Sequence, residues 1–181
     1  MKCFLDMDGV VADIVLGVCH HFKVANPFDD PAYCGPHTYN LMSIVGKGPE
    51  LWADLGFGFW ADLPETSEAA QIVDLVTQCF GVENVCILSR PTSNIGCMAG
   101  KRMWIERHFP QFANQFLFGI KKEFCASETA LLIDDTQENV KAFEDAGGLA
   151  FLVPRPWNDR HADEPQLVTI LREFLSYGRF R

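Results

Sequence analysis

Residues 2–10 read KCFLDMDGV, and the apolar run at the start of this stretch recurs along the chain. Its apolar run Lys2–Leu5 is followed directly by two acids and a glycine. Four later runs share its consecutive, non-alternating apolar character, which is typical of strands buried on both faces of a parallel sheet. These runs are Val85–Leu88, Phe116–Phe118, Ala130–Ile133 and Leu149–Val153.

Segments with helical periodicity separate the predicted strands. Each ends near a glycine or proline, which is a common stop signal. The predicted helices are Ala69–Phe80, Lys101–Phe109, Gln137–Ala146 and Leu167–Leu175, the last of them before Gly178. Strands that alternate with helices imply right-handed crossovers, so we predict an α/β fold with a doubly wound parallel sheet.

One long segment interrupts this alternation. Residues 26–63 are rich in glycine, proline and aromatic side chains and follow the first strand-helix unit. A segment of this length inside a compact domain is usually functional, for example as a lid, although it could also be an irregular extension that only covers the core. We therefore expect a core of residues 1–25 and 64–181 and a small cap at 26–63.

Composition narrows the class of protein. The 181 residues are 48% hydrophobic and 22% charged, with a net charge of −9, as in an ordinary globular domain. The longest basic run is Lys121-Lys122, so no nucleic acid polymer is expected as a partner. The apolar runs are far shorter than the ~20 residues that span a membrane. With an acid as early as Asp6, no signal peptide is expected, and the seven scattered cysteines favour a reducing, cytoplasmic location. An oligomer stays open.

Acidic residues follow two of the predicted strands. Asp6 and Asp8 end the first, and Asp134-Asp135 follow the fourth. Open α/β sheets bind ligands at the carboxyl ends of their strands, and clustered carboxylates favour a hard divalent cation such as Mg²⁺. Gly9 permits a sharp turn and lets backbone N–H groups approach an anion. The alternative for the second pair is a solvated turn in which Asp135 caps a helix.

A hydroxyl and a lysine complete the pattern. Ser89 ends the second predicted strand, where its hydroxyl can donate to a phosphate oxygen; otherwise it starts a turn before Pro91. A lysine that faces the carboxylates would neutralise them and hold a phosphate. Lys121 and Lys122 precede the fourth strand, and for Lys121 we favour simple exposure.

Taken in order, these residues resemble the four motifs of the haloacid dehalogenase (HAD) superfamily of phosphotransferases. The resemblance implies a Rossmann-like core in which Asp6 is the nucleophile and Asp8 the general acid/base. Ser89 matches the second motif and Lys122 the third, with Lys101 and Lys121 as rivals. The fourth motif is the acidic pair Asp134-Asp135.

The same resemblance implies a Mg²⁺ cofactor and a phosphate site. Mg²⁺ would contact the Asp6 carboxylate, the backbone carbonyl of Asp8 and Asp135, with Asp134 supporting. The phosphoryl oxygens would be held by Ser89, Lys122 and the backbone at Gly9, with help from Lys101.

The chain is similar in particular to the 5′(3′)-deoxyribonucleotidase branch. The matching stretches are 6–13, 59–64, 101–107, 131–135 and the late Arg155-Pro156-Trp157-Asn158. The likeness implies a small cap whose aromatic side chains hold a nucleobase. Candidate contacts are Trp52, Phe57, Trp60 and Arg90; we expect Trp52 to face the base and Trp60 to anchor the cap. Two departures are Ser89-Arg90, in place of a small hydroxyl pair, and Ile14, where an aromatic often stands.

The expected function is therefore Mg²⁺-dependent hydrolysis of nucleoside monophosphates through an aspartyl-phosphate. Two alternatives remain. One is a phosphatase or phosphomutase for a sugar phosphate or another small ester. The other is a receiver-like or inactive phosphate-binding domain, which would not need the second acid, Asp8. Cys19-His20-His21 resembles a metal cluster, but consecutive helical residues point in different directions.

Overall fold

The computed structural model describes residues 1–36 and 38–177. Its centre is a five-stranded sheet in the order β3-β2-β1-β4-β5, and all four strand pairs are parallel. The strands are β1 (Lys2–Leu5), β2 (Val85–Ser89), β3 (Phe116–Phe118), β4 (Ala130–Asp134) and β5 (Leu149–Leu152). The predicted doubly wound α/β fold is confirmed, and every predicted strand is present to within one residue at either end.

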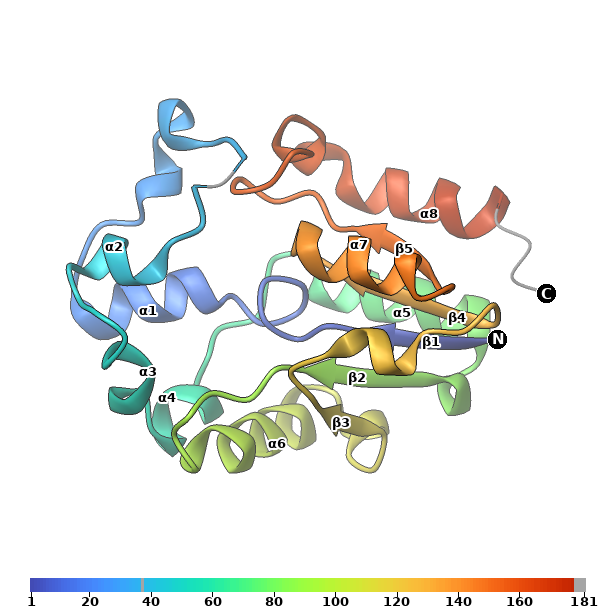
Figure 1. Cartoon of the computed structure of the whole chain (residues 1–181), viewed down its shortest axis with the longest axis horizontal. Coiled ribbons are helices and arrows are strands. Elements are labelled where there is room, and N and C mark those ends of the chain that lie inside the picture. Colours follow the sequence, from blue (N-terminus) through green and yellow to red (C-terminus); the bar gives the residue numbers. More distant parts are fainter. Residues whose placement is uncertain (37, 178–181) are drawn as a thin grey trace.

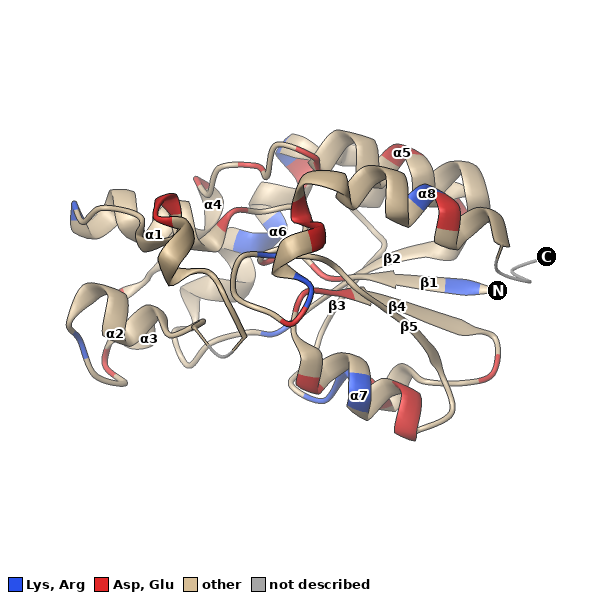
Figure 2. Cartoon of the chain, turned by 90° about the horizontal axis from the view of Figure 1, so that it is seen from above, with Lys and Arg blue, Asp and Glu red and all other residues tan. Residues whose placement is uncertain are grey.

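Both faces of the sheet are covered, which explains the consecutive apolar residues of the strands. Cys3 and Leu5 of β1 point into the larger hydrophobic cluster, whereas Phe4 packs on a smaller cluster around Phe143. Helices α5 (Ala69–Phe80) and α8 (Leu167–Tyr177) pack together on one face, and α7 (Gln137–Asp145) covers the other (Figure 2). Each face therefore demands an apolar side chain from alternate strand positions.

The helices of the core lie close to their predicted positions, with one correction. Helix α6 spans Gly96–His108 and begins five residues before the predicted start at Lys101. The side-chain oxygen of Asn94 accepts from the Gly96 N–H at 2.8 Å and so supports this earlier start. The predicted stop of the last helix at Gly178 lies outside the described residues.

The segment 26–63 contains several short helices in place of one long loop. It lies with α1 (Ile14–Phe22) beyond the carboxyl ends of the strands (Figure 1). Helix α4 (Phe57–Ala61) packs closely on α6, where a Cβ on Gly100 would lie only 2.5 Å from the Phe57 carbonyl oxygen. The short elements are the 3-10 helices Pro27–Asp29 and Pro31–Tyr33, followed by α2 (Leu41–Val45), α3 (Leu51–Asp54) and α4 (Phe57–Ala61). The division into core and cap stays a prediction.

The connections of the core add further 3-10 turns. These are Val82–Asn84, Pro110–Phe112, Lys122–Cys125 and His161–Gln166. Lysine and arginine residues are scattered over several elements among aspartate and glutamate residues (Figure 2). Within the described part of the chain, no helix has the length and apolar character needed to cross a membrane.

Candidate active site

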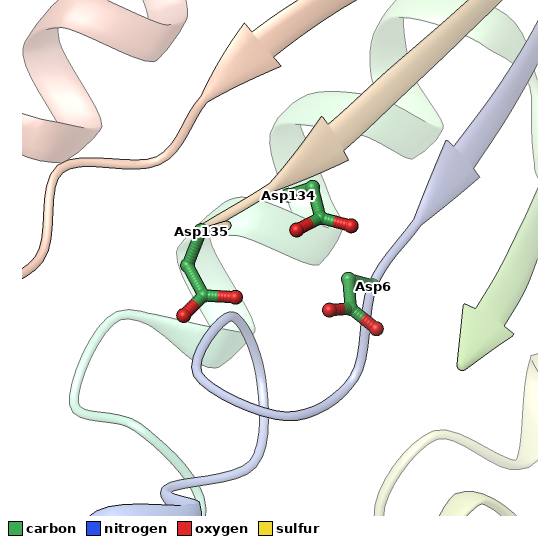
Figure 3. A group of neighbouring side chains, drawn as sticks. All are labelled: Asp6, Asp134 and Asp135. Atoms are coloured by element: carbon green, nitrogen blue, oxygen red, sulfur yellow. The ribbon is translucent and has the colours of Figure 1, made fainter. Parts of the chain in front are cut away.

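Three buried carboxylates meet where β1 and β4 end. Asp6 follows β1, and Asp134 and Asp135 lie at the end of β4 (Figure 3). The register pairs Leu5 with Ile133, so the next residue of each strand is an aspartate at the same level of the sheet. One ligand atom from each acid lies within 4.8 Å of the others. From β1 the chain adds strands first toward β2 and β3 and then, on the other side, toward β4 and β5. Open α/β sheets bind ligands at the point where the strand order reverses in this way.

Lys122 balances two of these charges. Its ammonium lies 2.7 Å from Asp6 Oδ1 and 2.6 Å from Asp134 Oδ2, and all three side chains are buried. Burial raises the pKa of Asp6 well above its usual value, and the charge of Lys122 partly offsets that effect. Burial opposes the charge on Lys122, but Asp6 and Asp134 outweigh it and raise the pKa of the lysine. Lys121, by contrast, is exposed and pairs with Glu123 at 3.3 Å.

The two acids of β4 have different partners. Asp134 accepts hydrogen bonds from Asn139, from the Thr136 N–H and from Lys122. The side chain of Asp135 accepts one from the indole N–H of Trp157, at 2.8 Å to Oδ2. Burial, and then the neighbouring charge of Asp134, raises the pKa of Asp135 to about 7. Asp134 is thus engaged by protein donors, whereas Asp135 has more capacity for a cation.

A tight loop follows Asp6 and passes beside Asp135 (Figure 3). Gly9 adopts φ +75°, and a Cβ there would lie 2.5 Å from Asp135 Oδ2, so glycine is needed both for its backbone angle and for space. Arg155 braces this loop from the far end of the chain. Its Nε donates to the Gly9 carbonyl at 2.6 Å and its Nη2 to the Val10 carbonyl at 3.2 Å.

A second lysine, Lys101, contacts Asp8, the other acid of the first motif. The ammonium of Lys101, on α6, contacts Asp8 Oδ2 and donates to Ser89 Oγ at 2.9 Å and to the Arg90 carbonyl at 2.8 Å. It also lies 4.6 Å from the centre of the Trp60 ring. Asp8 Oδ1 is buried and has no hydrogen-bond partner among the described residues. The Asp8 side chain is therefore separate from the three-carboxylate group, and its predicted backbone contact with Mg²⁺ stays a prediction.

The predicted cap contacts occupy different environments. Trp52 is partly buried and packs against the hydrophobic core, although its position in the sequence suggested no core partner. Trp60 is fully buried, and its indole donates to the Leu55 carbonyl at 2.8 Å. Phe57 and Arg90 are exposed. The roles of these four residues toward a substrate stay predictions.

Sequence reasoning missed the aromatic rings that adjoin the acids. The rings of Tyr39 and Phe28 lie 5.2 and 5.3 Å from the Trp157 ring, centre to centre. Desolvation, and then the charges of Asp135 and Asp8, raises the pKa of the Tyr39 hydroxyl. A signal for Trp157 was available, because it follows the carboxyl end of β5 just as the other site residues follow theirs.

Helix α1 places the side chains of Cys19, His20 and His21 in different environments. Cys19 is buried in the core, whereas His20 and His21 are exposed. In the described part of the chain, the one group of three or more His, Cys, Asp or Glu residues close enough to share a metal ion is Asp6, Asp134 and Asp135.

Neither a protein-family model nor a curated protein sequence matches the chain. Among solved structures, it is similar to a HAD family enzyme from Bacteroides thetaiotaomicron. A variant of that enzyme with one aspartate replaced by alanine, in complex with magnesium and inorganic phosphate, gives a TM-score of 0.44 at 11% identity over 86% of this chain and 94% of the other. The magnesium complex gives 0.42 at 13% identity over 87% and 94%.

Proposed function

We propose that this chain is a Mg²⁺-dependent phosphomonoester hydrolase of the HAD type, acting on nucleoside monophosphates. One observation carries the hydrolase proposal: Asp6 is buried between Lys122 and a second acid pair, and Asp8, two residues on, is held separately by Lys101. A nucleophile and an acid/base in distinct environments are what a two-step transfer through an enzyme carboxylate requires.

The three-carboxylate group suits Mg²⁺. Magnesium–oxygen distances are about 2.1 Å, so ligands on opposite sides of the ion lie about 4.2 Å apart. One carboxylate oxygen from each of Asp6, Asp134 and Asp135 lies within 4.8 Å of the others, a spacing that agrees with a single small cation. Asp6 and Asp135 would hold the ion, and Asp134 would orient Lys122. When bound, Mg²⁺ would polarise a phosphoryl oxygen and offset the negative charge of the substrate.

Each side chain of the site has its own role in the proposed reaction. A carboxylate oxygen of Asp6 attacks phosphorus, and the bond to the leaving oxygen breaks as that oxygen takes a proton from Asp8. Water next attacks the phosphorus of the aspartyl-phosphate and gives a proton to Asp8. This hydrolysis releases inorganic phosphate and restores Asp6. Lys122 favours the ionised form of Asp6 and orients it, while Lys101 and Ser89 contact the transferred phosphoryl oxygens.

The unpartnered oxygen of Asp8 supports its acid/base role. A buried polar atom without a partner is costly, and such atoms are found where a ligand supplies the missing contact. Here Lys101 fixes one oxygen of Asp8 and leaves Oδ1 for the leaving oxygen or the attacking water. A receiver-like domain would not need this second acid, so its environment favours a hydrolase.

The aromatic rings near the acids support a flat leaving group. Trp157 donates to Asp135, and the rings of Tyr39 and Phe28 pack on the Trp157 ring, where a leaving group could stack. A nucleobase stacked on such a ring gains ~1–3 kcal/mol, which a small ester without a ring does not.

The test begins with turnover of p-nitrophenyl phosphate and Mg²⁺. A panel of nucleoside monophosphates is then compared with sugar phosphates and a simple alkyl phosphate. We expect turnover of all classes, with the highest kcat/KM on nucleotides, and a phosphorylated protein in acid-quenched samples of the wild type but not of Asp6→Asn. A folded wild type that hydrolyses none of these esters would contradict the hydrolase, and a preference for sugar phosphates would contradict the nucleotide class.

A further inference from the structure

The segment Arg155–Asn158 holds Asp135 through both its backbone and its side chain. Asn158 Nδ2 donates to the Asp135 carbonyl at 2.9 Å and to the Val153 carbonyl at 2.8 Å. The Trp157 indole N–H donates to Asp135 Oδ2 at 2.8 Å, and the Trp157 side chain is only 9% exposed. The carboxylate therefore has a fixed donor on one of its two oxygens.

The same indole contacts the segment 26–63. The Phe28 and Tyr39 rings lie 5.3 and 5.2 Å from it, the second inclined at 37°. The backbone N–H of Gly35 donates to the Pro156 carbonyl at 2.8 Å, so the backbones meet as well. Trp157 thus bridges a proposed metal ligand and the predicted cap.

We propose that Trp157 is a positioning residue that orients Asp135 for Mg²⁺, and that Phe28 and Tyr39 hold the indole in place, so that cap docking and Mg²⁺ affinity are coupled. The inference rests on the proposed function, because Mg²⁺ is the cation assigned there. A ligand carboxylate that is already oriented loses less rotational freedom when it binds an ion. Donors that orient metal ligands in this way typically contribute about 10- to 100-fold in metal affinity.

The test is a calorimetric titration of Mg²⁺ into the metal-free chain. Trp157→Phe keeps an aromatic ring against Phe28 and removes the N–H, so we expect Mg²⁺ binding at least ~10-fold weaker than in the wild type. Trp104→Phe is the matched control. Trp104 lies on α6, and its buried indole donates to the Leu63 carbonyl at 2.7 Å, so the loss of this N–H should leave the Mg²⁺ affinity unchanged.

A second variant tests the coupling to the cap. Phe28→Leu removes a ring that packs on the indole and leaves the N–H donor in place. The Phe28 side chain has no polar group, so replacing it does not alter the charge near the acids. We expect a smaller loss of Mg²⁺ affinity than for Trp157→Phe. An unchanged affinity in Phe28→Leu would overturn the coupling.

The outcomes separate this inference from the proposed function. A wild type that binds no Mg²⁺ would overturn both. A wild type that binds Mg²⁺ as tightly as Trp157→Phe does would overturn the positioning role alone. Equal weakening in Trp104→Phe, with equal loss of thermal stability, would show general destabilisation and also overturn it. At saturating Mg²⁺, Trp157→Phe should regain most of its kcat, which a purely structural defect would not allow.

Discussion

Replacing Asp135 with asparagine should stabilise the metal-free protein at pH 8. The folded structure raises the pKa of this carboxyl from 3.8 to about 7, chiefly through burial and then through Asp134. The folded state therefore binds the proton more tightly than the unfolded state does. Its free energy of unfolding falls as pH rises from about 4 to about 7, and the loss is complete above that window.

The magnitude follows from the size of this pKa difference. A difference of about 3 corresponds to about 4 kcal/mol, and relaxation around the charge lowers what is observed. We expect metal-free Asp135→Asn to be ~2–4 kcal/mol more stable than the wild type at pH 8. The gain should vanish near pH 4, where both chains are neutral at this position. The asparagine oxygen can still accept from Trp157, so that contact does not confound the comparison.

Urea unfolding in EDTA at several pH values measures the difference. Asp134→Asn is the matched control, and it should be destabilising because Asp134 lies 2.6 Å from the buried Lys122. Mg²⁺ should then stabilise the wild type and have little effect on Asp135→Asn. Equal or lower stability of Asp135→Asn at pH 8 would refute the reasoning, because the carboxylate would then carry no burial cost for a cation to relieve.

Other expectations concern the remaining parts of the site. Asp6→Asn should fold and lose nearly all phosphatase activity in a steady-state assay, since an amide is a poor nucleophile; substantial turnover would sink the covalent mechanism. Lys122→Ala should lower kcat at least ~100-fold, Lys101→Ala less, and exposed Lys121→Ala hardly at all; a crippling Lys121 variant would move the third motif by one residue. Gly9→Ala should cost roughly 1–2 kcal/mol in urea unfolding through its φ of +75° and should also weaken Mg²⁺ binding; wild-type values for both would contradict the steric argument. EDTA should abolish activity and added Mg²⁺ restore it; full activity in EDTA would exclude a metal requirement.

The strands could be predicted from the sequence because burial on both faces leaves a local signature. Every position of β4, from Ala130 to Asp134, is buried, so its apolar residues are consecutive. The start of α6 could not be predicted in this way. Gly96 and Gly100 interrupt its apolar pattern because the backbone of α4 packs against them, and that reason lies in a distant part of the chain.

The lysines show the same limit at the site. By resemblance, Lys122 was the preferred lysine, with Lys101 and Lys121 as rivals, and only the tertiary structure shows which acid each one contacts. The fold buries Lys122 against Asp6 and Lys101 against Asp8, and it leaves Lys121 exposed. The contact between Trp157 and Asp135 could not be predicted for a related reason. Trp157 reaches Asp135 across 22 positions of the chain, a contact that no local pattern records.

The central position of β1 has a consequence for the order of folding. Its neighbours are β2 and β4, and Lys2 pairs with Ala130, so β1 is enclosed on both sides only after the chain has been made through β4. At ~5–20 residues per second, a ribosome needs roughly 6–25 s to make the intervening chain. Throughout that interval the edge of β1 that pairs with β4 is open, and open strand edges are prone to aggregate. Asp6 and Asp8, directly after it, supply the flanking charge that discourages such aggregation. The two carboxylates proposed to act in catalysis would thus also protect the nascent chain.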